Sequence, residues 1–204
     1  TSAYSSFSAT GFSDQPQRFA TKNIEGNPIH GTNELSLRSG KIFFQIFNLL
    51  AGTFPGTRHR KILLPLCPEY IGYADQGIEE GMFVACRPAI SWPMGESSRV
   101  FKYRIDFDAV EMALQQNDVG AIAVSRPTNP TGNVLTDDEV QRLSSLAEKH
   151  GIPLILDNAY GAPFPGVLFV PAQPFWAPHT ILTLSLSKLG LPGARTAPSM
   201  KNSP

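Results

Sequence analysis

The stretch VGAIAVSRPTNPTGNVLTDDEVQRLSSLAEKHGIPLILD, residues 119–157, decides the fold. It begins and ends with short apolar runs rich in branched residues, as strands buried on both faces do. Between them, Thr136 and Glu139 stand three positions apart at the start of a segment with helical spacing, which is the pattern of a capping box. Gly151 predicts where that helix ends. Strand, helix and strand in this order predict two parallel strands of one sheet.

The segments on either side continue this alternation. Three further apolar runs are short enough to be strands: 61–66, 82–88 and 180–185. Three other segments read as helices: 42–52, 68–81 and 106–116. We therefore expect an α/β fold, in which a mainly parallel sheet forms three layers with helices on both of its faces.

The helix at 106–116 is expected to bury Val110, Met112 or Leu114, which lie on neighbouring turns. Residues 89–106 lack a clear periodicity and are expected to form a loop.

The composition excludes several classes of protein. The chain of 204 residues has 17 basic and 17 acidic side chains and 42% hydrophobic residues, so no charge excess points to nucleic acid or a membrane surface. Cys67 and Cys86 are too few for a disulfide framework and are interpreted as buried apolar residues. No apolar run is long enough to span a bilayer and no secretory signal is visible, so we expect a cytoplasmic protein.

Three polar residues follow three of the predicted strands. Asn129 comes after the strand at 119–125, Asp157 ends the strand at 152–157, and Lys188 comes after the strand at 180–185. Parallel sheets bind ligands beyond the carboxyl ends of their strands. We therefore expect these three side chains to meet at one edge of the sheet.

The residue types at this edge suggest a particular ligand. A carboxylate at the end of an apolar strand, here Asp157, needs a cationic partner such as a protonated ring nitrogen. Lys188 can form an imine, and Arg195 offers a guanidinium suited to a phosphate. Together these groups describe a site for pyridoxal 5′-phosphate (PLP). Taken singly, a lysine after a strand is most often a solvated residue, and Asn-Pro-Thr-Gly is commonly only a turn.

Three segments strengthen this interpretation through a family resemblance. SRPTNPTGNVLTDDEV (125–140), LILDNAYGAPFPG (154–166) and SLSKLGLPGAR (185–195) resemble segments of the class I/II, fold-type I, PLP-dependent aminotransferases. The resemblance runs from about Phe43 to Arg195. Within the family it is strongest to the aminotransferases that exchange valine or alanine with pyruvate.

The resemblance implies three catalytic residues. Lys188 would condense with the cofactor aldehyde and then move the proton between the substrate Cα and the cofactor. Asp157 would keep the pyridine nitrogen protonated. Tyr160, together with Asn129, would hydrogen-bond the phenolic oxygen of the cofactor. No metal ion is implied.

Other residues are implied to bind the cofactor without taking part in proton transfer. Ser185 and Arg195 would bind its phosphate. Tyr70, in the sequence PEY, occupies the position where the family often stacks an aromatic ring on the pyridine, and Tyr73 is a neighbouring candidate.

The resemblance fails near both ends of the sequence. After Arg195 the chain reads TAPSMKNSP, so the C-terminal small domain of the family would be absent, and with it the arginine that binds the substrate α-carboxylate. Before the first predicted helix, NELSLRSGKI (33–42) replaces the Gly/Ser-rich phosphate loop of the family. We therefore expect a weakly specified segment at 1–41, a partial PLP-binding large domain at 42–195 and an unstructured tail at 196–204.

These features leave more than one function open. The first is transamination between a small aliphatic amino acid, valine or alanine, and a 2-oxo acid, pyruvate, impaired by the missing parts. The alternative is a non-catalytic remnant that at most binds PLP or dimerises, since the family typically forms homodimers. A PLP-dependent lyase on the same fold is a third possibility.

Overall fold

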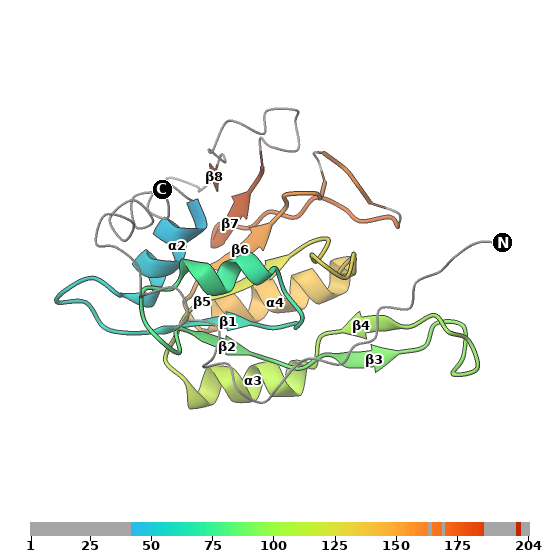
Figure 1. Ribbon diagram of the computed structural model, residues 1–204, viewed down its shortest axis with the longest axis horizontal. Coiled ribbons are helices and arrows are strands. Elements are labelled where there is room, and N and C mark those ends of the chain that lie inside the picture. Colours follow the sequence, from blue (N-terminus) through green and yellow to red (C-terminus); the bar gives the residue numbers. More distant parts are fainter. Residues whose placement is uncertain (1–41, 163–164, 169, 186–198, 201–204) are drawn as a thin grey trace, which may run out of the picture. The chain divides into compact units, whose positions relative to one another are not determined.

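The computed structural model describes residues 42–162, 165–168, 170–185 and the backbone of 199–200. Along the chain the elements are α2 (Ile42–Ala51), β1 (Lys61–Leu64), the 3₁₀ helix η2 (Ile71–Gln76), β2 (Phe83–Ala85), β3 (Ala89–Ser91), β4 (Lys102–Arg104), α3 (Phe107–Gln116), β5 (Val119–Ser125), α4 (Asp137–Lys149), β6 (Leu154–Asp157), β7 (Thr180–Thr183) and β8 (Ser199–Met200). Figure 1 shows the strands β1, β2, β5, β6 and β7 side by side, with helices packed against them.

The main sheet has six strands in the order β2-β1-β5-β6-β7-β8. The first five run parallel, and only β8 pairs antiparallel with β7. This confirms the mainly parallel sheet expected from the sequence. β8 lies at Ser199–Met200, so these two residues of the segment predicted to be an unstructured tail are in a strand.

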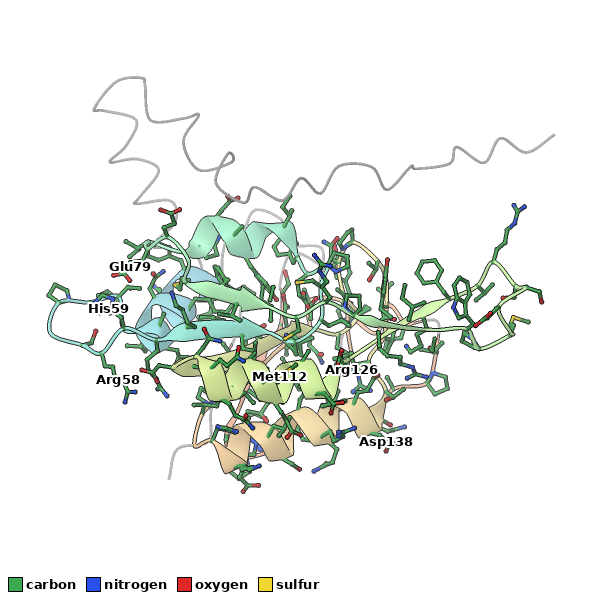
Figure 2. All side chains as sticks on the ribbon, turned by 90° about the horizontal axis from the view of Figure 1, so that it is seen from below. Arg58, His59, Glu79, Met112, Arg126 and Asp138 are labelled. Carbon is green, nitrogen blue, oxygen red and sulfur yellow. The ribbon has the colours of Figure 1, made fainter. Side chains whose placement is uncertain are left out.

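Two separate hydrophobic clusters lie on the two faces of this sheet. Successive residues of one strand point to opposite faces and so belong to different clusters. Leu63 and Leu154 belong to the first cluster, and their neighbours Ile62 and Ile155 belong to the second. α3 and α4 cover one face, and α2 with η2 covers the other. Figure 2 shows α3 and α4 together on one side of the strands. The three-layer arrangement is therefore confirmed for the part of the chain that the structure describes.

The ends of α4 follow from the local sequence. The backbone N–H of Glu139 donates to Thr136 Oγ1 over 3.2 Å, and the N–H of Thr136 donates to Glu139 Oε2 over 2.8 Å. This is the predicted capping box. Gly151 follows the helix with φ of 63°, a left-handed conformation that glycine adopts without strain. The predicted start and end of this helix are both confirmed.

One local prediction is confirmed for two of its three residues, and two others are wrong. On α3, Val110 and Leu114 are buried as expected, whereas Met112 (Figure 2) is 53% exposed. Residues 89–106 contain the antiparallel hairpin of β3 and β4, whose three-residue strands are too short to show a periodicity in the sequence. The helix expected at 68–81 is the shorter η2, with Gly72 inside it, where a Cβ would lie 2.5 Å from the ring of Tyr70.

No helix in the described part of the chain combines the length and the apolar character needed to cross a bilayer. Cys67 and Cys86 are both free thiols.

Candidate active site

Buried polar side chains gather where three adjacent strands end. The parallel register places Ser125, the last residue of β5, opposite Asp157, the last residue of β6. Asp157 in turn lies opposite Thr183, the last residue of β7. All three side chains are buried. The edge of the sheet predicted from the sequence therefore holds a row of polar groups in the position where parallel sheets bind ligands.

Asp157 lies at the centre of this row and is only 7% exposed. Its Oδ2 accepts a hydrogen bond from the hydroxyl of Tyr73 over 2.8 Å. Its Oδ1 accepts from the N–H of Ala159 over 3.0 Å and from the hydroxyl of Thr183 over 3.4 Å. Burial raises the pKa of the Asp157 carboxyl, and these three donors oppose that rise without cancelling it.

The donors around Asp157 are all neutral. Among the described residues, no lysine, arginine or histidine forms an ion pair with Asp157. A buried carboxylate without a counter-ion is costly. The site is therefore suited to a ligand that brings a positive charge, such as a protonated ring nitrogen.

Tyr73 has a role that the sequence did not reveal. It was a second candidate for stacking on a ring, but its side chain is 2% exposed and its hydroxyl is bound to Asp157. Its ring packs edge-on against Phe47 and Tyr70, with centroid distances of 5.2 and 5.6 Å. Burial and the nearby charge of Asp157 raise the pKa of Tyr73 well above its usual value, so it remains a donor. The two residues are 84 positions apart in the sequence, so no local pattern could predict the contact.

Tyr70 differs from Tyr73 in being accessible. Its side chain is 42% exposed, and it precedes η2 at the same edge of the sheet. Of the two tyrosines, Tyr70 is therefore the one whose ring is accessible to a ligand.

Glu69 is a second buried carboxyl that the sequence analysis missed. It is 9% exposed, and its oxygens accept from the N–H and the hydroxyl of Ser125 and from the N–H of Tyr70. Burial raises the pKa of Glu69 to about 7, and the charge of Asp157 adds to the rise. A single glutamate in a turn has no periodic signal, so only the fold reveals it.

The remaining predicted residues follow the same strands. Asn129 is half-buried in the loop after β5, Tyr160 is half-buried three residues after Asp157, and Ser185 is half-buried two residues after β7. Lys188 and Arg195 lie outside the described residues.

Arg126 is a buried cation beside this edge, and the sequence analysis missed it as well (Figure 2). Its guanidinium donates to the carbonyls of Leu135 and Gln173, each over 2.9 Å, and to the carboxylate of Asp137. Asp137 also accepts from the N–H of Gln173 over 3.0 Å. Arg126 therefore joins the loop after β5 to the loop that follows β6 and Tyr160.

The profile of the family described as aminotransferase class I and II matches residues 83–198. Valine–pyruvate aminotransferase of Escherichia coli (strain K12) is 54% identical over 158 residues, which are 77% of this chain and 36% of that protein.

Two solved structures share both sequence and fold with the chain. A putative amino-acid aminotransferase from Psychrobacter arcticum 273-4 has a TM-score of 0.73 at 47% identity, over 80% of this chain and 39% of that one. Valine–pyruvate aminotransferase from Salmonella typhimurium LT2 has a TM-score of 0.63 at 48% identity, over 78% of this chain and 38% of that one. The chain thus spans less than two fifths of the length of these relatives.

Proposed function

The chain belongs to the class I and II aminotransferase family, and on that premise we propose that it takes part in transamination between a small aliphatic amino acid, valine or alanine, and a 2-oxo acid, pyruvate. The substrates follow from the similarity to valine–pyruvate aminotransferases. The observation that carries the proposal is the buried Asp157, which is surrounded by neutral donors at the carboxyl ends of three parallel strands.

The cofactor of this reaction is PLP. When bound, it supplies an electron-withdrawing ring that stabilises negative charge at the substrate Cα. Asp157 fits such a group, because a protonated ring nitrogen provides the positive charge that the described surroundings lack. Tyr73 holds the Oδ2 of Asp157 and so fixes the direction in which the carboxylate presents its charge.

The other residues have roles proposed from the family. Lys188 anchors the cofactor and carries the proton to and from Cα. Asn129 and Tyr160 hydrogen-bond the phenolic oxygen of the cofactor, and Ser185 and Arg195 bind its phosphate.

Tyr70 completes the proposed cofactor site, because its accessible ring can cover one face of the pyridine. The Tyr70 ring packs edge-on against the Tyr73 ring at a centroid distance of 5.6 Å, which helps to hold it in place.

We also propose that the protein works as a homodimer in the cytoplasm. The homodimer is the usual assembly of the family. The free thiols of Cys67 and Cys86 agree with a reducing compartment. Light scattering of the purified chain measures its mass in solution, and a monomer at all concentrations would contradict the dimer.

A spectrum with PLP, followed by borohydride reduction and peptide mapping, tests the cofactor site. We expect a pyridoxyl group on Lys188 and none in Lys188→Ala, whereas a label spread over surface lysines would contradict the assignment. Incubation of the unreduced, PLP-loaded chain with valine and pyruvate then tests the reaction. Formation of alanine supports transamination, and PLP binding without alanine supports the non-catalytic alternative.

A further inference from the structure

We propose that Glu69 is a positioning residue: it fastens the turn that carries Tyr70 to the carboxyl end of β5, and so sets where the Tyr70 ring stands at the edge of the sheet. The inference relies on the proposed function for the identity of the ring that Tyr70 meets. The fastening itself is a property of the chain alone and is tested without any ligand.

The hydrogen bonds of Glu69 join two segments that are far apart in the sequence. Its Oε1 accepts from the N–H of Ser125 over 2.9 Å, and its Oε2 accepts from the Ser125 hydroxyl over 2.6 Å. The pair is separated by 56 positions. The Glu69 carboxyl therefore binds both the backbone and the side chain of Ser125, the last residue of β5. Two hydrogen bonds fix the orientation of the Glu69 carboxyl as well as its distance from Ser125.

The same carboxyl also holds the residue next to it. Oε2 of Glu69 accepts from the N–H of Tyr70 over 3.1 Å. Three residues further on, the hydroxyl of Tyr73 is bound to Asp157 at the end of β6. The turn is thus tied to two adjacent strands, by Glu69 on one side of Tyr70 and by Tyr73 on the other. Tyr70, which is 42% exposed, lies between these two anchors in the sequence.

The surroundings of Glu69 are acidic or neutral. Asp157 faces it from β6, Tyr73 from η2 and Ser125 from β5, and Cys67 belongs to the same turn. No described cation forms an ion pair with it. Three donors converge on the two oxygens of Glu69, so the ionised carboxylate is the form that accepts all of them. The buried charge of Glu69 costs stability, and only neutral donors at the site hold it. Glu69 is therefore better suited to positioning its neighbours than to stabilising the fold.

Hydrogen–deuterium exchange of the ligand-free chain tests the fastening. In Glu69→Ala, the amides of Ser125 and Tyr70 lose their acceptor, and we expect their exchange to speed up about tenfold or more. The amides of the central residues of β6 should not change. Glu80→Ala, which removes an exposed acid near η2, is the matched control and should leave all of these amides unaltered. Unchanged exchange at Ser125 and Tyr70, or a uniform increase through the sheet, would overturn the proposal.

A double-mutant cycle on PLP affinity tests whether Glu69 acts through Tyr70. We expect Glu69→Ala and Tyr70→Ala each to weaken PLP binding about tenfold, and the double variant to be little worse than either. If the loss of PLP affinity in the double variant equals the product of the two single losses, Glu69 does not act through Tyr70. If the wild-type chain binds no PLP, the proposed function fails, and the exchange experiment still decides the fastening by itself.

Discussion

Asp157 and Arg126 are buried at the same edge of the sheet, yet their surroundings differ in kind. Arg126, 5% exposed, has a carboxylate and two carbonyls around its guanidinium, so its charge is matched within the described chain. Asp157 has only two hydroxyls and one N–H. Glu69 resembles Asp157 in this respect.

The difference predicts a structural role for Arg126 and a role in the proposed cofactor site for Asp157. Removal of a buried charge whose partners are complete leaves those partners unpaired, so loss of Arg126 should loosen the two loops that it joins. A buried charge that only neutral groups surround costs free energy in the folded chain, and such groups are frequent at binding and catalytic sites. Four variants test this difference between Arg126 and Asp157.

The largest effect is expected at Asp157. Asp157→Ala should lower the affinity for PLP roughly a thousandfold, about 4 kcal/mol, because it removes the charge opposite a buried ring nitrogen. A fluorescence titration with PLP measures the loss. Asp138→Ala, an exposed acid in the first turn of α4 (Figure 2), is the control and should bind like the wild type. Equal affinities for the Asp157 variant and this control would remove Asp157 from the site.

The next effect is a pH dependence of the free energy of unfolding. Burial raises the pKa of Glu69 from 4.5, the value of a solvated glutamate, to about 7 in the folded chain. Between these values the folded state holds the proton and the unfolded state does not, so stability falls as pH rises. Relative to Glu69→Gln, the wild type should lose about 3 kcal/mol from pH 4.5 to pH 7. Urea unfolding at several pH values measures this. Parallel curves for the two proteins would contradict the raised pKa.

A smaller effect is expected from Arg126→Met. The carbonyls of Leu135 and Gln173 lose their donor, so the free energy of unfolding should fall by about 2 kcal/mol. Arg58, which pairs with Asp118 and is 79% exposed, provides the control. Arg58→Met should cost less than about 0.5 kcal/mol. Denaturant unfolding distinguishes the two arginines (both labelled in Figure 2), and equal losses would mean that Arg126 is not structural.

The smallest effect is expected from Tyr73→Phe. The change removes one hydrogen bond to Asp157, and PLP affinity should fall by about 1 kcal/mol, roughly fivefold. The pKa of Asp157 should rise further, because the hydroxyl that favours its charged form is gone. Tyr70→Phe keeps the accessible ring and is expected to bind PLP normally. A titration in which Tyr73→Phe matches the wild type would show that this hydrogen bond does not orient Asp157.

Several features could be predicted from the sequence because their causes are local. The capping box of α4, the glycine that ends the helix and the apolar strands β5 and β6 each depend on residues close together in the chain. The position of Asp157 at the end of a strand follows in the same way. The rule that strand ends of a parallel sheet share one edge then predicted that Asn129, Asp157 and Lys188 meet there. Asn129 and Asp157 do follow β5 and end β6, and Lys188 lies outside the described residues.

The remaining features depend on contacts that cross the fold. The pairs Tyr73–Asp157, Glu69–Ser125 and Arg126–Gln173 join residues 84, 56 and 47 positions apart. Which polar group is buried, and whether its charge is matched, is decided only when the strands are assembled, because burial and hydrogen-bond geometry belong to the packed chain. Local residue patterns were enough to predict the sheet and the edge where its polar residues collect. Only the packing of the strands shows that the charge of Arg126 has partners within the described residues, whereas the donors that Asp157 has there are neutral.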